Sequence, residues 1–274
     1  MNELIRKPAA IGYFYPEGLN NIRSLIDSFG VVPPKEKINA FGIMSPHAGY
    51  IYSGKTSYSG FSSINIKNNI IVIGPNHTGI GAEFSLINKG KYDFQDFSVP
   101  INSELAEAII KDDGSPFVSD ELAHLKEHSV EVQIPLIYNL KKDFNIVPIV
   151  VSFISYNDVL NASKAIFNAL KKLNLLDDVL IVASSDMTHY ESAESARLKD
   201  DIAINEILNL NPRGLYEKVR ENDITMCGFI PAAIMLNVAK MAGRTKSKLT
   251  GYTNSGDVSG DYSSVVGYSS IVIY

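Results

Sequence analysis

Three short apolar segments of this 274-residue chain each lead directly into a histidine, at His47, His77 and His189. The segments 38–45, 69–74 and 178–183 are rich in β-branched residues, which predicts strands, and the unbroken apolar run 69–74 is typical of a strand buried on both faces. Ligands of α/β sheets collect at the carboxyl ends of strands. We therefore expect the three histidines to meet at one edge of one sheet.

Apolar runs alternate with helical patterns along the rest of the chain. Helical spacing predicts helices over 53–64, 102–111, 129–141, 157–173, 194–210, 212–221 and 228–242. Further strands are predicted over 145–153, 248–253 and 264–273, and 82–89 with 91–97 resembles a hairpin or a pair of edge segments around Gly90. Helical crossovers favour parallel pairing. We predict one three-layer α/β domain over 1–274, with a mainly parallel or mixed central sheet flanked by helices.

The overall composition excludes several classes of protein. A formal net charge of -5 argues against a nucleic-acid partner, which usually binds a basic face. No stretch approaches the ~18 apolar residues that span a bilayer, so no membrane partner is expected. One cysteine cannot form an intramolecular disulfide, and the first residues lack the apolar core of a signal peptide. The expected location is the cytoplasm.

Two histidines and the single cysteine are the candidate metal ligands. Gly and Pro residues frame both His47 and His77, and such loops present a side chain instead of burying it. Cys227 precedes Gly228 and a predicted helix, and a helix N-terminus stabilises a thiolate. Imidazoles and a thiol that converge form either a metal site or a nucleophile site.

Asp186 and His189 are the candidate acid/base residues. They are three residues apart, so a helix that began at Thr188 would place them on one face. A carboxylate beside an imidazole orients the ring and raises its basicity, which suits a general base. The alternative is that Asp186 caps a helix and the histidine is incidental.

Candidate pocket-wall residues are found in two further places. Segment 124–131 contains two histidines and two glutamates, each pair four residues apart, but lacks the His-Glu-x-x-His pattern of a zincin. It either lines the pocket or supports the ligand histidines from behind in a hydrogen-bond network. We assign His128 and Glu131 to substrate binding, together with Tyr50 and Tyr52, which follow His47 closely.

Several separate motifs, in this order and at these spacings, resemble the Memo family (mediator of receptor-kinase-driven cell motility). The resemblance covers nearly the whole chain and rests on Arg6-Lys7-Pro8-Ala9, Gly12-Tyr13-Phe14-Tyr15-Pro16, Pro46-His47-Ala48-Gly49-Tyr50, Gly74-Pro75-Asn76-His77, Glu127-His128-Ser129-Val130-Glu131, Ser185-Asp186-Met187-Thr188-His189 and Cys227-Gly228.

The resemblance implies a fold similar to class III extradiol ring-cleavage dioxygenases of the protocatechuate type. Those enzymes hold non-haem iron(II) with two histidines and a glutamate, and use a further histidine as acid/base. When these roles are carried over to this chain position by position, His47 and His77 match the two histidine ligands, and His189 matches the acid/base histidine. Cys227 stands at the carboxylate position, as in Memo proteins. Because a thiolate is a softer ligand than a carboxylate, ring cleavage is not carried over.

Three functions remain open at this stage. The first is a redox protein that holds one transition metal, iron or copper with zinc as a third option, through His47, His77 and Cys227, with Asp186 and His189 as acid/base. The second is a metal-free thiol hydrolase with Cys227 as nucleophile, His189 as base and Asp186 as orienting group. The third is a peptide-binding signalling module, as the family resemblance implies. The pocket motifs contain no arginine that could bind the phosphate group of a phosphorylated peptide.

The expected ligand is a small molecule or a peptide end, and the oligomeric state is left open.

Overall fold

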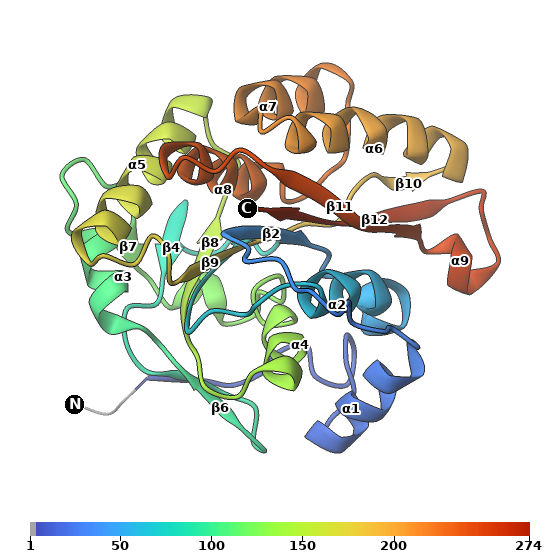
Figure 1. Cartoon of the computed structure of the whole chain (residues 1–274), viewed down its shortest axis with the longest axis horizontal. Coiled ribbons are helices and arrows are strands. Elements are labelled where there is room, and N and C mark those ends of the chain that lie inside the picture. The colour runs from blue at the N-terminus through green and yellow to red at the C-terminus, as the bar shows by residue number, and fades with distance from the viewer. Residues whose placement is uncertain (1–3) are drawn as a thin grey trace.

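The computed structural model describes residues 4–274, which form a large mixed sheet and a small separate one (Figure 1). The large sheet contains, in spatial order, β10 (His189–Glu191), β12 (Val265–Ile273), β2 (Gly42–Ser45), β9 (Val179–Ser184), β3 (Asn69–Pro75), β8 (Asn145–Val151), β4 (Phe84–Leu86) and β7 (Val118–Ser119), with β11 (Ser247–Asn254) paired to β12. The small sheet contains β1 (Ile5–Arg6), β5 (Lys91–Asp93) and β6 (Ser98–Pro100).

Helices cover both faces of the large sheet. They are α1 (Leu19–Ser28), α2 (Lys55–Ser62), α3 (Ser103–Ile110), α4 (Gln133–Leu140), α5 (Tyr156–Lys172), α6 (Ala193–Leu208), α7 (Pro212–Glu221), α8 (Phe229–Met241) and α9 (Gly256–Ser259), with a π-helical turn η1 (Tyr50–Gly54) and a 3-10 turn η2 (Leu122–His124). In Figure 1, α5, α6, α7 and α8 lie on one side of the sheet, and α1, α2 and α4 lie on the other.

Strand residues alternate between two apolar cores, one on each face of the sheet. In β3, Ile71 and Ile73 belong to the core that also contains residues of α3, α5 and α8, whereas Ile70 and Val72 belong to the core on the side of α2 and α4. The period of two follows from the pleat of a strand. It explains why the central strands are apolar throughout. The predicted three-layer α/β class, with a mixed sheet flanked by helices, is confirmed.

Four neighbouring strands in the middle of the sheet are parallel. β9 pairs with β2 on one side and with β3 on the other, and β3 pairs in turn with β8. β12 and β4 flank this group in antiparallel orientation, and the last two strands of the chain, β11 and β12, pair with each other in antiparallel orientation. Parallel strands end at the same edge of a sheet, so the segments after β2, β3, β8 and β9 lie together.

The hairpin predicted for 82–89 and 91–97 is wrong. β4 joins the edge of the large sheet beside β8, whereas β5 pairs with β6 and β1 in the small sheet. Gly90 between them has a φ of +98°, and a Cβ there would meet the carbonyl oxygen of Leu4. The chain therefore turns from one sheet into the other at this glycine. Helix α1 was not predicted from the sequence.

Local capping fixes several helix starts. The side chain of Asn102 accepts a hydrogen bond from Leu105 N at the start of α3, and Ser155 with Asp158 forms a capping box at the start of α5. Among the described residues, no helix combines the length and the apolar character needed to cross a membrane.

Candidate metal centre

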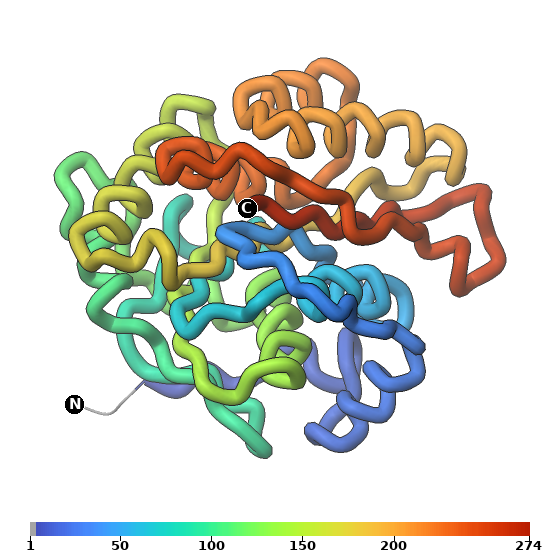
Figure 2. Tube along the Cα trace, viewed as in Figure 1, coloured from blue at the N-terminus to red at the C-terminus, as the bar shows by residue number. Residues whose placement is uncertain are grey.

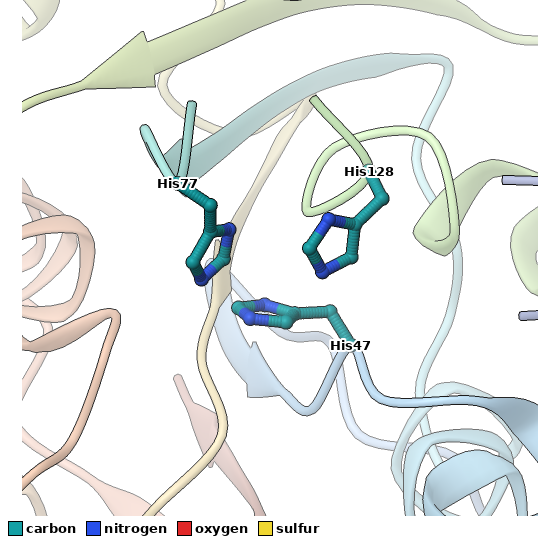
Figure 3. Close-up of side chains that lie close together, drawn as sticks. All are labelled: His47, His77 and His128. Carbon is teal, nitrogen blue, oxygen red and sulfur yellow. The ribbon is translucent and has the colours of Figure 1, made fainter. Parts of the chain in front are cut away.

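Three imidazole rings face one another beyond the carboxyl edge of the sheet (Figure 3). They belong to His47 after β2, His77 after β3, and His128 in the loop before α4. One ring nitrogen from each lies within 4.8 Å of the others. Ring centroids are 5.1 Å apart for His47 and His77, and 4.7 Å apart for the stacked pair His77 and His128. His47 is buried, His128 is half-buried and His77 is exposed, so the group is reached from the surface.

The hydrogen bonds of Ser184 determine the tautomer of His47. The Ser184 hydroxyl donates its one proton to the carbonyl oxygen of Ser129, at 2.6 Å, and accepts from Gln133 Nε2 at 2.8 Å. His47 Nδ1 lies 2.9 Å from the same oxygen and must therefore donate to it. Nδ1 carries the ring proton, which leaves the Nε2 lone pair available to a metal.

Glu127 has the same effect on the ring of His77 and lies near the ring of His128. Its carboxylate accepts from His77 Nδ1 at 2.9 Å and lies 3.5 Å from His128 Nδ1. It also accepts from the backbone N–H groups of His77 and Ser129. A carboxylate that receives the Nδ1 proton of a ligand histidine fixes the ring and raises the basicity of Nε2. Glu127 thus supports the histidines from behind, one of the two roles predicted for its segment.

The protonation states at this site favour a cation. Burial lowers the pKa of His47 well below its ordinary value, and the neighbouring rings of His77 and His128 lower it further. Burial also lowers the pKa of His128 to about 4. Burial alone would raise the pKa of Glu127, but the hydrogen bond and charge of His77 outweigh it and lower the pKa to about 2. Neutral His47 and His128 and an ionised Glu127 are the forms that a metal requires.

The donor group is of the right size for one ion. Metal–nitrogen bonds of about 2.1 Å place three donors at most about 3.6 Å from one another, so donors that lie within 4.8 Å would close by up to about 1.2 Å around an ion. Gly74 allows this proximity, because a Cβ there would lie 2.3 Å from Ser129 Oγ and would push the His128 loop away from β3. The three histidines could therefore hold a metal ion.

Cys227 lies beside this group and contacts His47. Its Sγ is 3.2 Å from His47 Nε2 and accepts from Asp186 N at 3.3 Å. Burial, together with the Asp186 carboxylate, raises the pKa of the Cys227 thiol well above its ordinary value. Gly228 permits the approach, since a Cβ there would lie 2.2 Å from the Ser184 carbonyl oxygen. The sequence analysis grouped Cys227 with His47 and His77. In the structure the third member of the compact group is His128, and the Cys227 sulfur lies beside the group.

Asp186 and His189 lie near the site but not on one helix face. Residues 185–188 are irregular and His189 opens β10, so no helix begins at Thr188. Asp186 is buried and accepts from the backbone N–H groups of His47 and Ala48. Burial raises its pKa, although these hydrogen bonds and the nearby His189 oppose the shift.

The ring of His189 is turned toward the segment before Cys227. His189 Nδ1 lies 2.9 Å from the carbonyl oxygen of Thr225, which can only accept, so Nδ1 carries the proton. Its Nε2 is left to accept a proton. His189 is half-buried and lies outside the three-histidine group.

The residues assigned to substrate binding are placed differently from one another. Glu131 is fully buried and accepts from Arg6, Ala9 N, Ala10 N and the Tyr15 hydroxyl, so its carboxylate has no capacity left for a ligand. The Tyr50 hydroxyl is buried and donates to Val132 O at 2.6 Å. Tyr52 is 38% exposed and remains accessible. His128 lies in the three-histidine group that could hold a metal ion.

Sequence reasoning missed the roles of Ser184, Gln133 and Arg6. Ser184 is the last residue of β9. Its position at the carboxyl end of a strand, just before Asp186, is the sequence signal that could have indicated a role at the site. Arg6 donates to the carbonyl oxygens of His124 and Glu127 from more than a hundred residues away, a contact that no local pattern reveals.

Comparisons with known proteins agree along the whole chain. A family model described as "Memo-like protein" matches residues 6–272. A "MEMO1 family protein" of Aquifex aeolicus is 42% identical over 270 residues, which are 98% of each chain. One from Thermoplasma volcanium is 37% identical over 275 residues, again 98% of each chain. The crystal structure of an uncharacterized protein from Escherichia coli K12 superposes with a TM-score of 0.54 at 14% identity, over 84% of this chain and 98% of that one, a likeness of fold alone.

Proposed function

Since this chain belongs to the Memo-like protein family, we propose that it binds one transition metal ion and uses it in redox chemistry on a small molecule or peptide end. The family resemblance stated from the motifs is confirmed. The observation that carries the proposal is the group of His47, His77 and His128, whose donor nitrogens face one another. The Nδ1 proton of His47 is fixed by Ser184, and that of His77 by Glu127.

The donor set favours iron or copper, with zinc as a third option. Imidazole suits all three metals, and a soft thiolate favours copper(I), zinc or thiolate-ligated iron. Cys227 Sγ is 3.2 Å from His47 Nε2 and is therefore the nearest candidate for a fourth donor. A bound iron or copper ion would supply electron transfer and Lewis acidity at the site, and zinc would supply Lewis acidity alone.

The surrounding residues have distinct roles in this proposal. Asp186 holds the backbone of the His47 loop, and the free Nε2 of His189 accepts or returns a proton of the ligand. Tyr52 is exposed beside the His47 loop and contacts the ligand there. Tyr50 and Glu131 support the loops and do not contact the ligand.

Titration of metal-free protein with Co²⁺, followed by absorption spectroscopy, tests the ligand set. We expect one equivalent to bind to the wild type, with affinity at least about 10-fold weaker in His128→Ala. Cys227→Ser should keep the stoichiometry and lose the sulfur-to-cobalt charge-transfer band. His189→Asn is the matched control, since this histidine lies outside the group. If His128→Ala binds Co²⁺ as the wild type does and Cys227→Ser does not bind it, then the third metal ligand is Cys227 and not His128.

The redox part of the proposal has a separate test. Iron- or copper-loaded protein should undergo reversible one-electron reduction by ascorbate and reoxidation by air, followed by the absorption spectrum. An ion that stays in one oxidation state under these conditions would contradict a redox role and leave metal binding intact.

A second candidate, the thiol hydrolase, is favoured by the contact of Cys227 with His47 at 3.2 Å, a distance typical of a nucleophile and its base. The base would then be His47 in place of the predicted His189, because the Nε2 of His47 is the ring nitrogen in contact with the sulfur. The raised pKa of the Cys227 thiol opposes this function. Rapid alkylation of the metal-free protein by iodoacetamide at pH 7, lost in His47→Ala, would favour the hydrolase, and slow alkylation would favour the metal.

A further inference from the structure

A cavity of about 160 Å³ lies between the end of β3, the segment after β8 and the start of α8. Most of its lining is apolar, and two of its polar lining residues, His77 and Cys227, adjoin the metal centre. The apolar lining residues are Pro75, Val151, Phe153, Phe229, Ile230 and Pro231.

Two residues connect this cavity to the metal centre. His77 and Cys227 line it, His77 belongs to the three-histidine group, and Cys227 Sγ lies 3.2 Å from His47 Nε2. A molecule with one end at the metal centre would therefore have the cavity directly beside it. This place differs from the surface near Tyr50 and Tyr52 that the sequence suggested.

Two phenylalanines close the cavity on its outer side. Phe153 and Phe229 have ring centroids 5.8 Å apart and also line a second, outer cavity of about 360 Å³ that contains Arg220. The Phe153 side chain is 66% exposed, so it forms the part of this wall that faces the solvent. The wall limits how long a group the inner cavity accepts.

We propose that this cavity binds a compact apolar group that the ligand carries next to its metal-binding end. A cavity of about 150 Å³ lined by apolar side chains accommodates benzene, so the group has up to about six carbon atoms, whether a ring or a branched chain. The proposal rests on the proposed function for the position of the polar end, and on the cavity alone for the apolar end. It makes Phe153 a residue that determines ligand length.

Hydroxamates of increasing size, bound to the metal-loaded protein, test the size limit by competition titration. Benzohydroxamate and cyclohexanecarbohydroxamate should bind about 10- to 50-fold more tightly than acetohydroxamate, because burial of their rings adds about 1.5 to 2.3 kcal/mol of apolar transfer. 4-Phenylbenzohydroxamate should lose this gain, since its second ring meets Phe153. Equal affinity for acetohydroxamate and benzohydroxamate would overturn the proposal.

Two variants separate the cavity from the metal centre. Ser152→Phe places a ring in the cavity from a loop position outside the donor group, and should abolish the preference for benzohydroxamate while acetohydroxamate binding stays the same. Phe153→Ala joins the two cavities and should restore tight binding of 4-phenylbenzohydroxamate. This gain cannot arise from misfolding. Failure of both variants to change the preferences would contradict the proposed location.

A probe without a metal-binding end makes the result independent of the proposed function. Fluorobenzene should bind the metal-free wild type, seen as broadening of its ¹⁹F resonance, and should not bind Ser152→Phe. Fluorobenzene binding without metal binding supports the cavity and refutes the proposed function. Metal binding with neither fluorobenzene binding nor a preference among the hydroxamates supports metal binding at the site and refutes the cavity proposal.

Discussion

At the scale of single residues, Glu127 connects the backbone to two of the three facing rings. Its side chain is 1% exposed, and it accepts the Nδ1 proton of His77 together with two backbone N–H groups. Since the carboxylate is ionised and contacts no solvent, its charge acts on the rings and on any cation they bind.

Replacing Glu127 by Gln should weaken metal binding about 10- to 100-fold, the usual effect of losing a partner behind a ligand histidine. The amide keeps the size but offers one acceptor oxygen and no charge. Isothermal titration with Zn²⁺ measures the effect, with Glu107→Gln as control, because Glu107 pairs with Lys111 on the surface. Equal affinity in the two variants would show that the carboxylate is not part of the site.

His124 is a buried histidine with no role in the site. Its Nδ1 lies 3.4 Å from the Tyr92 hydroxyl, and its Nε2 has no partner among the described residues. Burial lowers the pKa of His124 to about 4, so the folded protein releases a proton that the unfolded chain keeps below pH 6.5. Its contribution to stability is therefore present above pH 6.5 and is lost as the pH falls toward 4.

His124→Gln should flatten the acid side of the stability profile. Between pH 7.5 and pH 5, the wild type should lose about 2 kcal/mol more of its free energy of unfolding than the variant does, because 1.5 pH units correspond to about 2 kcal/mol for one group. Urea denaturation at several pH values gives the comparison. Parallel profiles for the two proteins would mean that the pKa of His124 is the same in the folded and the unfolded chain, which contradicts the lowering by burial.

At the scale of elements, the first described segment of the chain holds the loop that carries His128. Figure 2 shows this segment passing beneath the sheet on the side of α4. Arg6 donates to Glu127 O and to the Glu131 carboxylate, and the ring of Phe14 lies 4.3 Å from that of His128. Phe14 O also accepts from Tyr50 N, next to the His47 loop. One segment thus joins two of the ligand loops.

Glu131→Gln should lower the free energy of unfolding by about 3 kcal/mol or more, because it leaves the buried Arg6 guanidinium without its acid partner. Glu107→Gln, at a partly exposed pair, should cost less than about 1 kcal/mol. Urea denaturation measures both. A small loss in Glu131→Gln would show that Arg6 finds another partner and that the segment is held by its apolar contacts.

The elements also show which parts of the site could be predicted from the sequence. His47 and His77 were placed correctly together because each follows a buried parallel strand, and strand order brings those ends together without further information. His128 was not predicted to lie with these two histidines because segment 124–131 was interpreted with helical spacing. In the structure a loop separates η2 from α4, so His124 and His128 point to different surroundings. Long-range partners such as Arg6 leave no local signal.

At the scale of the whole molecule, the large sheet brings remote loops together. β9 lies between β2 and β3, so the Ser184 hydroxyl meets the ring of His47 while the loops of His47 and His77 flank it. The alternation of apolar strand segments with helical patterns predicted the layers correctly. It could not predict the small sheet, in which β1 pairs with β5 across more than eighty residues.

The central claim is that the imidazoles at this edge bind a metal ion, and elemental analysis tests it most directly. The protein is purified without oxygen from a host supplied with iron, copper and zinc. The account predicts about one equivalent of iron or copper per chain in the wild type and in His189→Asn, and almost none in the folded His47→Ala, His77→Ala double variant. Equal metal content in the double variant and the wild type would contradict it.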